Sequence, residues 1–189
     1  IGTLMGVVSK ASVNENVAWI EKFNVLGGTL LSAGINGTAI NSISEGAKDT
    51  LNDNGSIFFR THTGKAGIYF NDSHTCTEIT DDYAYVENNR TMNKGVRSIR
   101  ATILPRLNSP VQVDSETGQL SPEVVKAYEV DGYKALEEMQ NNSEVSSFDV
   151  YMNPDQNILA ESELVLEFEL VPTGTARNIK GIIGFSNPF

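Results

Sequence analysis

Hydrophobic and polar residues alternate most regularly near the end of the chain. From Glu163 to Leu170, leucines and a phenylalanine fall on one side of an extended segment and glutamates on the other. A Pro-Thr-Gly turn at 172–174 precedes a second apolar run, Ile179 to Phe185. Alternation with a period of two on either side of a turn predicts a β-hairpin. Its first strand carries an acidic face made of Glu163, Glu167 and Glu169.

The clearest helical pattern runs from about Arg90 to Leu104 and ends at Pro105. Apolar residues recur there every three or four positions, which predicts one dry stripe consisting of Met92, Val96, Ile99 and Ile103. The basic residues fall on the opposite side, at about 100° per residue, and they are Arg90, Lys94, Arg97 and Arg100. We therefore expect a helix with a dry face and a basic face.

Two further helices are indicated in the first third of the chain. Ser12 with Glu15 forms a capping-box pattern, which predicts a helix that buries Val17, Trp19 and Ile20. Ser44 is a good cap for a second helix through Leu51, ended at Asn54-Gly55. The glycine-rich stretch "LGGTLLSAGING" predicts a loop and a short strand.

The remaining pattern predicts strands and one more helix. Two strands flank Thr63-Gly64, with core positions at Ile57, Phe59, Ile68 and Phe70. Ser121-Pro122-Glu123 is a typical helix start, and the helix runs to about Met139 with a possible break at Asp131-Gly132. Short strands are expected at 83–86 and 148–152. The fold class is thus α+β, with mixed sheets flanked by helices and a C-terminal β-hairpin.

The amino-acid composition is typical of a globular protein. The chain has 189 residues, 40% of them hydrophobic, which suffices for one sizeable domain or two small ones. The best boundary is the composition shift at Asn88-Asn89, giving units 1–88 and 89–189. No apolar run approaches the roughly 20 residues of a membrane span. The chain starts at Ile1 without a signal-peptide pattern, and we expect a fragment of a longer protein.

Charge and cysteine content narrow the function classes. A net charge of −10 argues against broad nucleic-acid binding, which requires basic patches. The single cysteine, Cys76, excludes an internal disulfide framework and is typical of a reducing compartment.

One stretch combines chemically active side chains: His62 precedes "DSHTC", which holds Asp72, His74 and Cys76. Zinc sites normally need four such ligands in characteristic spacings, and the chain has two histidines and one cysteine. We expect a polar loop here, no metal and no cofactor. Because no catalytic signature occurs either, we expect no enzyme, with a Cys-His hydrolase as the alternative.

The basic helix face and the acidic strand face suggest a different role. Either alone is typical of a solvated surface, and alternating glutamates also discourage edge-to-edge aggregation. Together, in an acidic chain, they indicate self-association through complementary patches. A monomeric binding module, in which the hairpin closes its own sheet, is the other alternative.

The order and spacing of several segments resemble the tail sheath proteins of contractile phages and related injection machines. A strand and loop are followed by "NNRTMNKGVR" opening a long helix, then "LPRLNSPV", a helical middle and the terminal apolar segment. The resemblance covers nearly the whole chain and is closest to the sheath-like branch of Bacteroidetes-type prophages. It implies the C-terminal part of a longer subunit: residues 1–88 belong to a middle domain and 89–189 to an assembly domain.

The resemblance also implies a mechanical function. Sheath subunits polymerise helically around an inner tail tube and, on a baseplate signal, contract to drive the tube through an envelope. The partners would be other copies of the chain, the tube protein and the baseplate, in a virion tail or injection particle assembled in the bacterial cytoplasm. The last strand, with Ile179, Ile182, Ile183 and Phe185, would be exchanged with a neighbouring subunit, although an intramolecular hairpin remains the alternative.

Overall fold

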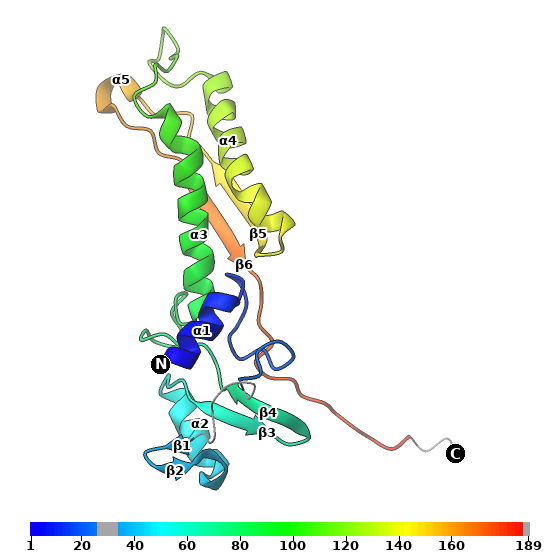
Figure 1. The fold of residues 1–189 in the computed structure, drawn as a ribbon. Helices are drawn as coiled ribbons and strands as arrows, with labels where there is room; N and C mark the ends of the chain where they lie inside the picture. Colours follow the sequence, from blue (N-terminus) through cyan, green and yellow to red (C-terminus); the bar gives the residue numbers. More distant parts are fainter. Residues whose placement is uncertain (26–33, 187–189) are drawn as a thin grey trace.

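The computed structural model describes residues 1–25 and 34–186, which form an elongated α+β structure (Figure 1). This confirms the predicted fold class, and each described sheet is an antiparallel pair. The helices are α1 (Gly2–Lys10), α2 (Glu45–Asp53), α3 (Val86–Ile103), α4 (Pro122–Asn141) and α5 (Ile158–Glu161). The strands are β1 (Gly34–Ile35), β2 (Thr38–Ala39), β3 (Phe59–His62), β4 (Lys65–Phe70), β5 (Val145–Tyr151) and β6 (Glu167–Pro172). No helix in these ranges is long and apolar enough to cross a membrane.

The upper part in Figure 1 has two layers, with α3 and α4 packed on one face of the β5–β6 pair. The antiparallel register puts Phe148 opposite Leu170 and Val150 opposite Phe168. These apolar residues face the helices, so the predicted alternation is confirmed in both strands. The buried core of this part consists of Leu136, Met139, Val145 and Val150, and Phe148, Phe168 and Leu170 pack against it.

Two helical glycines allow the helices to lie close to the sheet. A Cβ on Gly132 in α4 would lie 2.6 Å from Val150 Cγ1, and one on Gly95 in α3 would lie 2.9 Å from Leu170 Cδ2. The break that the sequence predicts at Asp131-Gly132 does not occur, and α4 is continuous from Pro122 to Asn141. The glycine is accommodated because the sheet occupies the space where a side chain would stand.

The lower part contains the first two helices and the β3–β4 hairpin. Its main cluster buries Val17, Val25 and Phe70, with Leu4, Val7 and Val8 of α1 packed against it. The predicted second helix is confirmed as α2: the Ser44 side chain accepts a hydrogen bond from Ala47 N, and Gly55 follows the helix with φ +71°. The predicted hairpin around Thr63-Gly64 is also confirmed.

The helix predicted from Ser12 is wrong. Glu15 does accept a hydrogen bond from Ser12 N at 2.8 Å, but the segment continues as turns. Asn16 Oδ1 accepts from Ala18 N at 2.7 Å, a local bond that competes with helix formation. Val17 is buried as predicted, whereas Trp19 and Ile20 are 48% and 36% exposed. The helix at this end is α1, whose apolar spacing of three and four residues the sequence reading missed.

Two smaller differences concern a predicted strand and the start of the long helix. Tyr85 makes an isolated bridge to His74 in place of the expected strand at 83–86. The long helix starts at Val86, four residues earlier than predicted, where Val86 N donates to Ser73 O. Most of the glycine-rich stretch "LGGTLLSAGING" lies outside the described residues.

Replacing Gly132 with alanine should destabilise the protein, although alanine favours helix formation by about 1 kcal/mol. The added methyl group would overlap Val150 and Phe168, and overpacking of this kind costs about 1–3 kcal/mol. Urea unfolding followed by circular dichroism should show a net loss.

Gly46→Ala in α2 is the matched control, because a Cβ there would have no neighbour within 4 Å. It should leave stability unchanged or raise it by up to about 1 kcal/mol. Equal effects of the two substitutions would contradict the close approach of α4 to the sheet.

Candidate functional site

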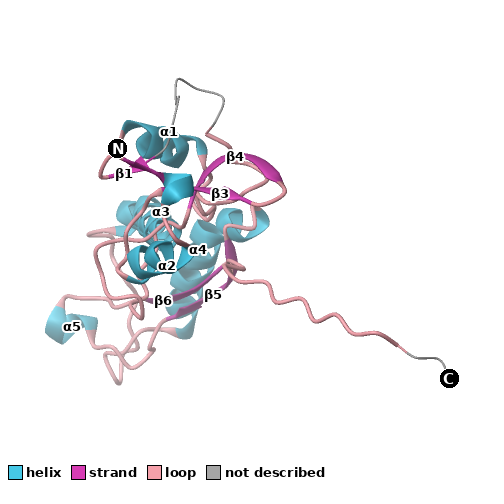
Figure 2. Ribbon diagram, turned by 90° about the horizontal axis from the view of Figure 1, so that it is seen from below, coloured by secondary structure: helices cyan, strands magenta, loops and turns pink. Residues whose placement is uncertain are grey.

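The last described part of the chain, residues 178–186, runs away from the body; we call it the terminal segment (Figures 1 and 2). It forms no strand within the described part of the chain. Its large apolar side chains are almost fully exposed: Ile179 89%, Ile182 98%, Ile183 99% and Phe185 109%. The predicted hairpin is therefore not formed within the chain, since β6 pairs with β5, and the exchanged strand stays a prediction.

Of the predicted acidic face, Glu167 and Glu169 lie on the side of the sheet that carries no helix. Glu163 lies in the irregular segment before β6, because the strand begins at Glu167 and not at Glu163 as predicted. Glu163, Glu167 and Glu169 are all exposed, and none makes an ion pair within residues 1–25 and 34–186. Asp149 of β5 lies opposite Glu169, so like charges face each other across the pair. Asp149 also accepts a hydrogen bond from the Tyr133 hydroxyl, which raises the pKa of Tyr133. This face of the sheet is anionic and lacks a compensating cation in the described chain.

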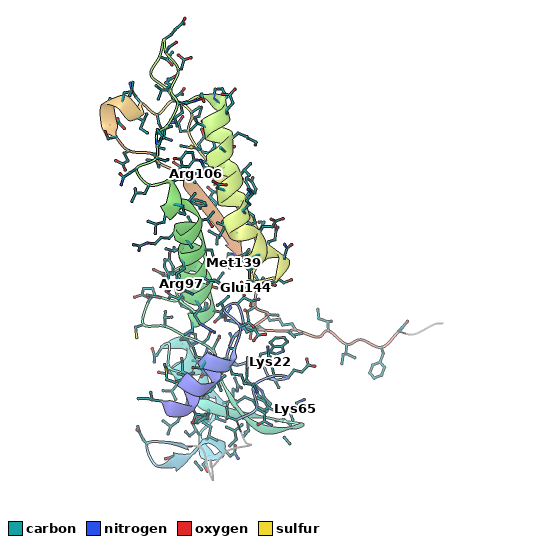
Figure 3. The ribbon with its side chains drawn as sticks, turned by 45° about the horizontal axis from the view of Figure 1, so that its top comes forward. Lys22, Lys65, Arg97, Arg106, Met139 and Glu144 are labelled. Atoms are coloured by element: carbon teal, nitrogen blue, oxygen red, sulfur yellow. The ribbon has the colours of Figure 1, made fainter. Side chains whose placement is uncertain are left out.

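The four predicted cations of α3 divide into two pairs. Arg90 donates to the carbonyl oxygens of Ser12 and Ala11, both at 3.0 Å, and Lys94 donates to Glu144 Oε1 at 2.7 Å. These two side chains therefore hold parts of the chain together. Arg97 and Arg100 are exposed, and neither makes an ion pair in the described residues. Figure 3 labels Arg97 on α3 and Glu144 at the end of α4.

The apolar stripe of α3 borders a groove with a volume of about 840 Å³. Its walls come from α3, from the segment after α3 and from the inward side of β6. The α3 wall is the predicted stripe, Met92, Val96, Ile99 and Ile103, and the opposite wall includes Leu164, Phe168 and Leu170. Val96 is more than half exposed. The stripe is thus a partly open apolar surface, not a fully dry face.

A polar cluster joins the lower and upper parts; we call it the polar junction, and its members are Asn16, Asp72, Ser73, Tyr85, Glu87 and Arg177. Four of them, Asn16, Asp72, Ser73 and Glu87, are buried, whereas the Arg177 side chain is 28% exposed. Arg177 Nε donates to Asp72 Oδ2 at 3.0 Å, and an Arg177 Nη donates to Glu87 Oε1 at 2.6 Å. Asp72 and Glu87 are both more than nine-tenths buried. One guanidinium therefore bridges two buried carboxylates.

The remaining members complete the hydrogen bonding of those carboxylates. Asn16 Nδ2 donates to Asp72 at 2.7 Å and to Glu87 at 3.2 Å, and the Ser73 hydroxyl donates to Glu87. The Arg177 guanidinium carbon lies 3.4 Å from the centre of the Tyr85 ring, a cation–π arrangement. Sequence analysis missed this cluster, because Arg177 is 105 positions from Asp72 and no local pattern links them.

The chemically active stretch does not assemble into a site. Cys76 is free and exposed, His74 Nε2 lies 3.2 Å from Asn52 Oδ1, and Asp72 belongs to the polar junction. Burial, together with the nearby Arg60 charge, lowers the pKa of His62. Within the described residues, no three His, Cys, Asp or Glu side chains are grouped so that they could hold a metal ion.

The difference between the paired and the unpaired cations of α3 can be tested by measuring the stability of substituted proteins. Lys94→Met should destabilise the protein by about 1–3 kcal/mol, because it leaves the buried Glu144 carboxylate without its cation. Arg97→Met is the matched control on the same helix and should change stability by no more than about 0.5 kcal/mol. Thermal unfolding of both variants checks this, and a larger loss from Arg97→Met would contradict the assignment.

Comparison with known proteins identifies the fold. No curated protein sequence matches the chain at a significant level. The structure is similar to a chain of the anti-feeding prophage baseplate, with a TM-score of 0.57 and 13% identity, covering 84% of this chain and 44% of that chain. It is similar to the contracted helical sheath of the anti-feeding prophage, with a TM-score of 0.57 and 14% identity, covering 76% and 40%. It is also similar to the contracted PVC sheath complex of an extracellular contractile injection system, with a TM-score of 0.58 and 14% identity, covering 76% and 40%.

These similarities confirm the predicted resemblance to sheath proteins at the level of the fold. The chain spans 40–44% of the length of these structural neighbours. Two domains of one sequence family also match: the DUF2586 N-terminal domain over residues 1–74 and the DUF2586 C-terminal domain over residues 82–189. Residues 75–81, between the two matched regions, lie shortly before α3, whereas the sequence predicted a boundary between residues 88 and 89, inside the first turn of that helix. Together the two matches span most of the sequence, and the chain belongs to the DUF2586 family.

Proposed function

We propose that this chain is part of a sheath-type structural subunit of a contractile injection particle. In this role copies polymerise helically around an inner tube, attach to a baseplate, and contract to drive the tube through a cell envelope. The particle would be a phage-like tail or injection machine, assembled in the bacterial cytoplasm. The function is mechanical and involves no catalysis, and the interactions are between copies and with the tube, not with nucleic acid or membrane.

The terminal segment is the observation that carries this proposal. Ile179, Ile182, Ile183 and Phe185 expose apolar surface that a single chain leaves in water. Full burial of one such side chain contributes about 1.5–3 kcal/mol to the free energy of association. A partner that covers several of them would therefore bind with a substantially more favourable free energy. An extended apolar segment that leaves the body is suited to pairing with the edge of another sheet.

The β5–β6 pair offers an acceptor for such a segment. In the described residues β6 has a strand neighbour on one side, β5, and its other edge is unpaired. Figure 1 shows α4 on the β5 side and α3 on the β6 side, so the apolar groove along α3 adjoins the unpaired edge. A third strand beside β6 would form hydrogen bonds with the backbone groups of its unpaired edge and would cover the groove. We infer that the terminal segment of another copy occupies this position.

Charge complementarity supports the same arrangement of copies. Arg97 and Arg100 are exposed cations without an ion pair in the described chain, and the sheet face with Glu167 and Glu169 is an exposed anionic surface. We infer that these surfaces meet between neighbouring copies, or that Arg97 and Arg100 meet an acidic surface of the tube. Arg90 and Lys94 would contribute indirectly, since they hold α3 against the rest of the chain.

A baseplate component is the second candidate, because the neighbour that covers 84% of this chain comes from a baseplate structure. The two roles differ in the geometry of the assembly. Negative-stain electron microscopy of the concentrated full-length protein should show hollow cylinders of variable length for a sheath. Closed rings of fixed height would support the baseplate role. Concentration-independent monomers, with and without a tube template, would favour a binding module and justify an activity assay with Cys76→Ala.

Ile183→Asp tests the terminal segment directly. Ile183 has no contact to lose in the single chain, so the melting temperature should stay unchanged, while a buried charge in the assembly should abolish polymerisation or weaken it at least about tenfold. Asn178→Asp adds the same charge at the start of the segment, on the opposite side of an extended strand, and should assemble. Normal cylinders from Ile183→Asp would refute the role of the segment.

Reversal of the free α3 cations tests the charged surfaces. The double variant Arg97→Glu/Arg100→Glu should fold normally and fail to assemble below about 0.15 M salt, where such contacts are least screened. Mixing it with Glu167→Lys/Glu169→Lys should restore assembly if the two surfaces meet between copies. Sedimentation and electron microscopy give the readout. Unimpaired assembly of the first variant alone would exclude the cationic contact.

A further inference from the structure

We propose that Arg177 is a positioning residue that prevents the terminal segment from closing onto its own β6 and so directs it away from the body. The biological use of this direction rests on the proposed function, since only an assembling protein needs a donated strand. The conformation itself, however, is a property of the single chain. It can therefore be measured without any assembly.

The chain between β6 and the terminal segment is attached to the body at Pro172, at Thr173 and at Arg177. At the end of β6, Pro172 O accepts from the Ser146 hydroxyl at 3.0 Å. Next, Thr173 Oγ1 accepts from Asn14 Nδ2 at 3.5 Å, and Asn14 also donates to Ser143 O. The attachment ends at Arg177, in the polar junction. Beyond this point the side chains become almost fully exposed.

The position of Arg177 is incompatible with the hairpin that the sequence suggests. In a two-residue hairpin at Thr173-Gly174, residue 177 would pair with Leu170 on the unpaired edge of β6. Leu170 lies against Gly95 of α3, whereas Glu87 lies eight residues earlier, about 12 Å along the helix axis at 1.5 Å per residue. An arginine side chain cannot span that distance from a site opposite Leu170. The junction and the hairpin therefore exclude each other.

The chemistry of the junction makes release of Arg177 unfavourable. Asp72 and Glu87 are buried, and without the guanidinium two carboxylates would share a pocket with no cation. Leaving buried charges unpaired is strongly destabilising. The planar guanidinium donates to both carboxylates at once and stacks on the Tyr85 ring, which the point charge of a lysine cannot reproduce. Arg177 is thus bound by groups that belong to the lower part and to the start of α3.

The test measures the direction of the segment in the dilute, monomeric chain. Spin labels on the natural Cys76, which is exposed, and on an introduced Ile179→Cys report one distance between the body and the segment. With Arg177 present, electron paramagnetic resonance should give one narrow distance distribution. Arg177→Met should broaden and shift it, and amide hydrogen exchange within 178–186 should slow as the segment closes onto β6. Arg177→Lys keeps the charge and should restore the narrow distribution only in part.

Arg177→Met alone is expected to lower the melting temperature. A second variant therefore separates the effect of Arg177 on the direction of the terminal segment from its effect on stability. The triple change Arg177→Met/Asp72→Asn/Glu87→Gln removes the buried charges together with the guanidinium. It should recover much of the lost melting temperature, while the distance distribution stays broad and shifted. An unchanged narrow distribution in the triple variant would overturn the proposal. A freed segment in a protein that never polymerises would refute the proposed function and leave this inference standing.

Discussion

Two buried carboxylates, Asp72 and Glu87, require a cation, and the cation comes from a residue close to the far end of the chain. Their side chains are removed from water at the point where the loop after β4 meets the first turn of α3. Arg177 compensates both, and Asn16 and Ser73 fill the remaining hydrogen-bonding positions. Segments from residues 16, 72, 87 and 177 are thereby fixed relative to one another. The junction connects the start of the long helix to the loop after β4 and to the chain that follows β6.

The upper part of the molecule is an incomplete structure when taken as a single chain. α3 presents an apolar stripe to a groove of about 840 Å³, and β6 has one unpaired edge beside it. At the same time the terminal segment exposes four large apolar side chains. Both surfaces are unfavourable in water, and each has the chemistry to cover the other. In the proposed function these two surfaces would cover each other between copies, because the junction keeps them apart within one chain.

Several elements could be predicted from the sequence because local interactions decide them. The Ser44 cap and the Asn54-Gly55 stop define α2, and Pro122 at the first helical position marks the start of α4, where the Ser121 side chain makes no cap hydrogen bond. Alternation defines β5 and β6, with Glu167 and Glu169 on one face. The basic face of α3 was also predicted, since helical periodicity alone fixes which residues share a side. These features depend on neighbours within a few positions, so the order of residues is sufficient to find them.

The sequence by itself determined that α2, α3 and α4 are helices, which side of β5 and β6 faces the core, and the surplus of negative charge on the other side of that sheet. Tertiary structure alone decided which of these elements meet. The capping-box pattern at Ser12 did not become a helix, because Asn16 is held by Asp72 and Glu87 from distant parts of the chain. Arg90 and Lys94 became internal contacts, while Arg97 and Arg100 make no ion pair within the described residues, although helical periodicity places all four on one side of the helix. The apolar terminal segment did not form its hairpin, because Arg177 is bound at buried charges 90 and 105 positions away. Periodicity carries local information, whereas the pairing of buried charges across such separations depends on the folded chain.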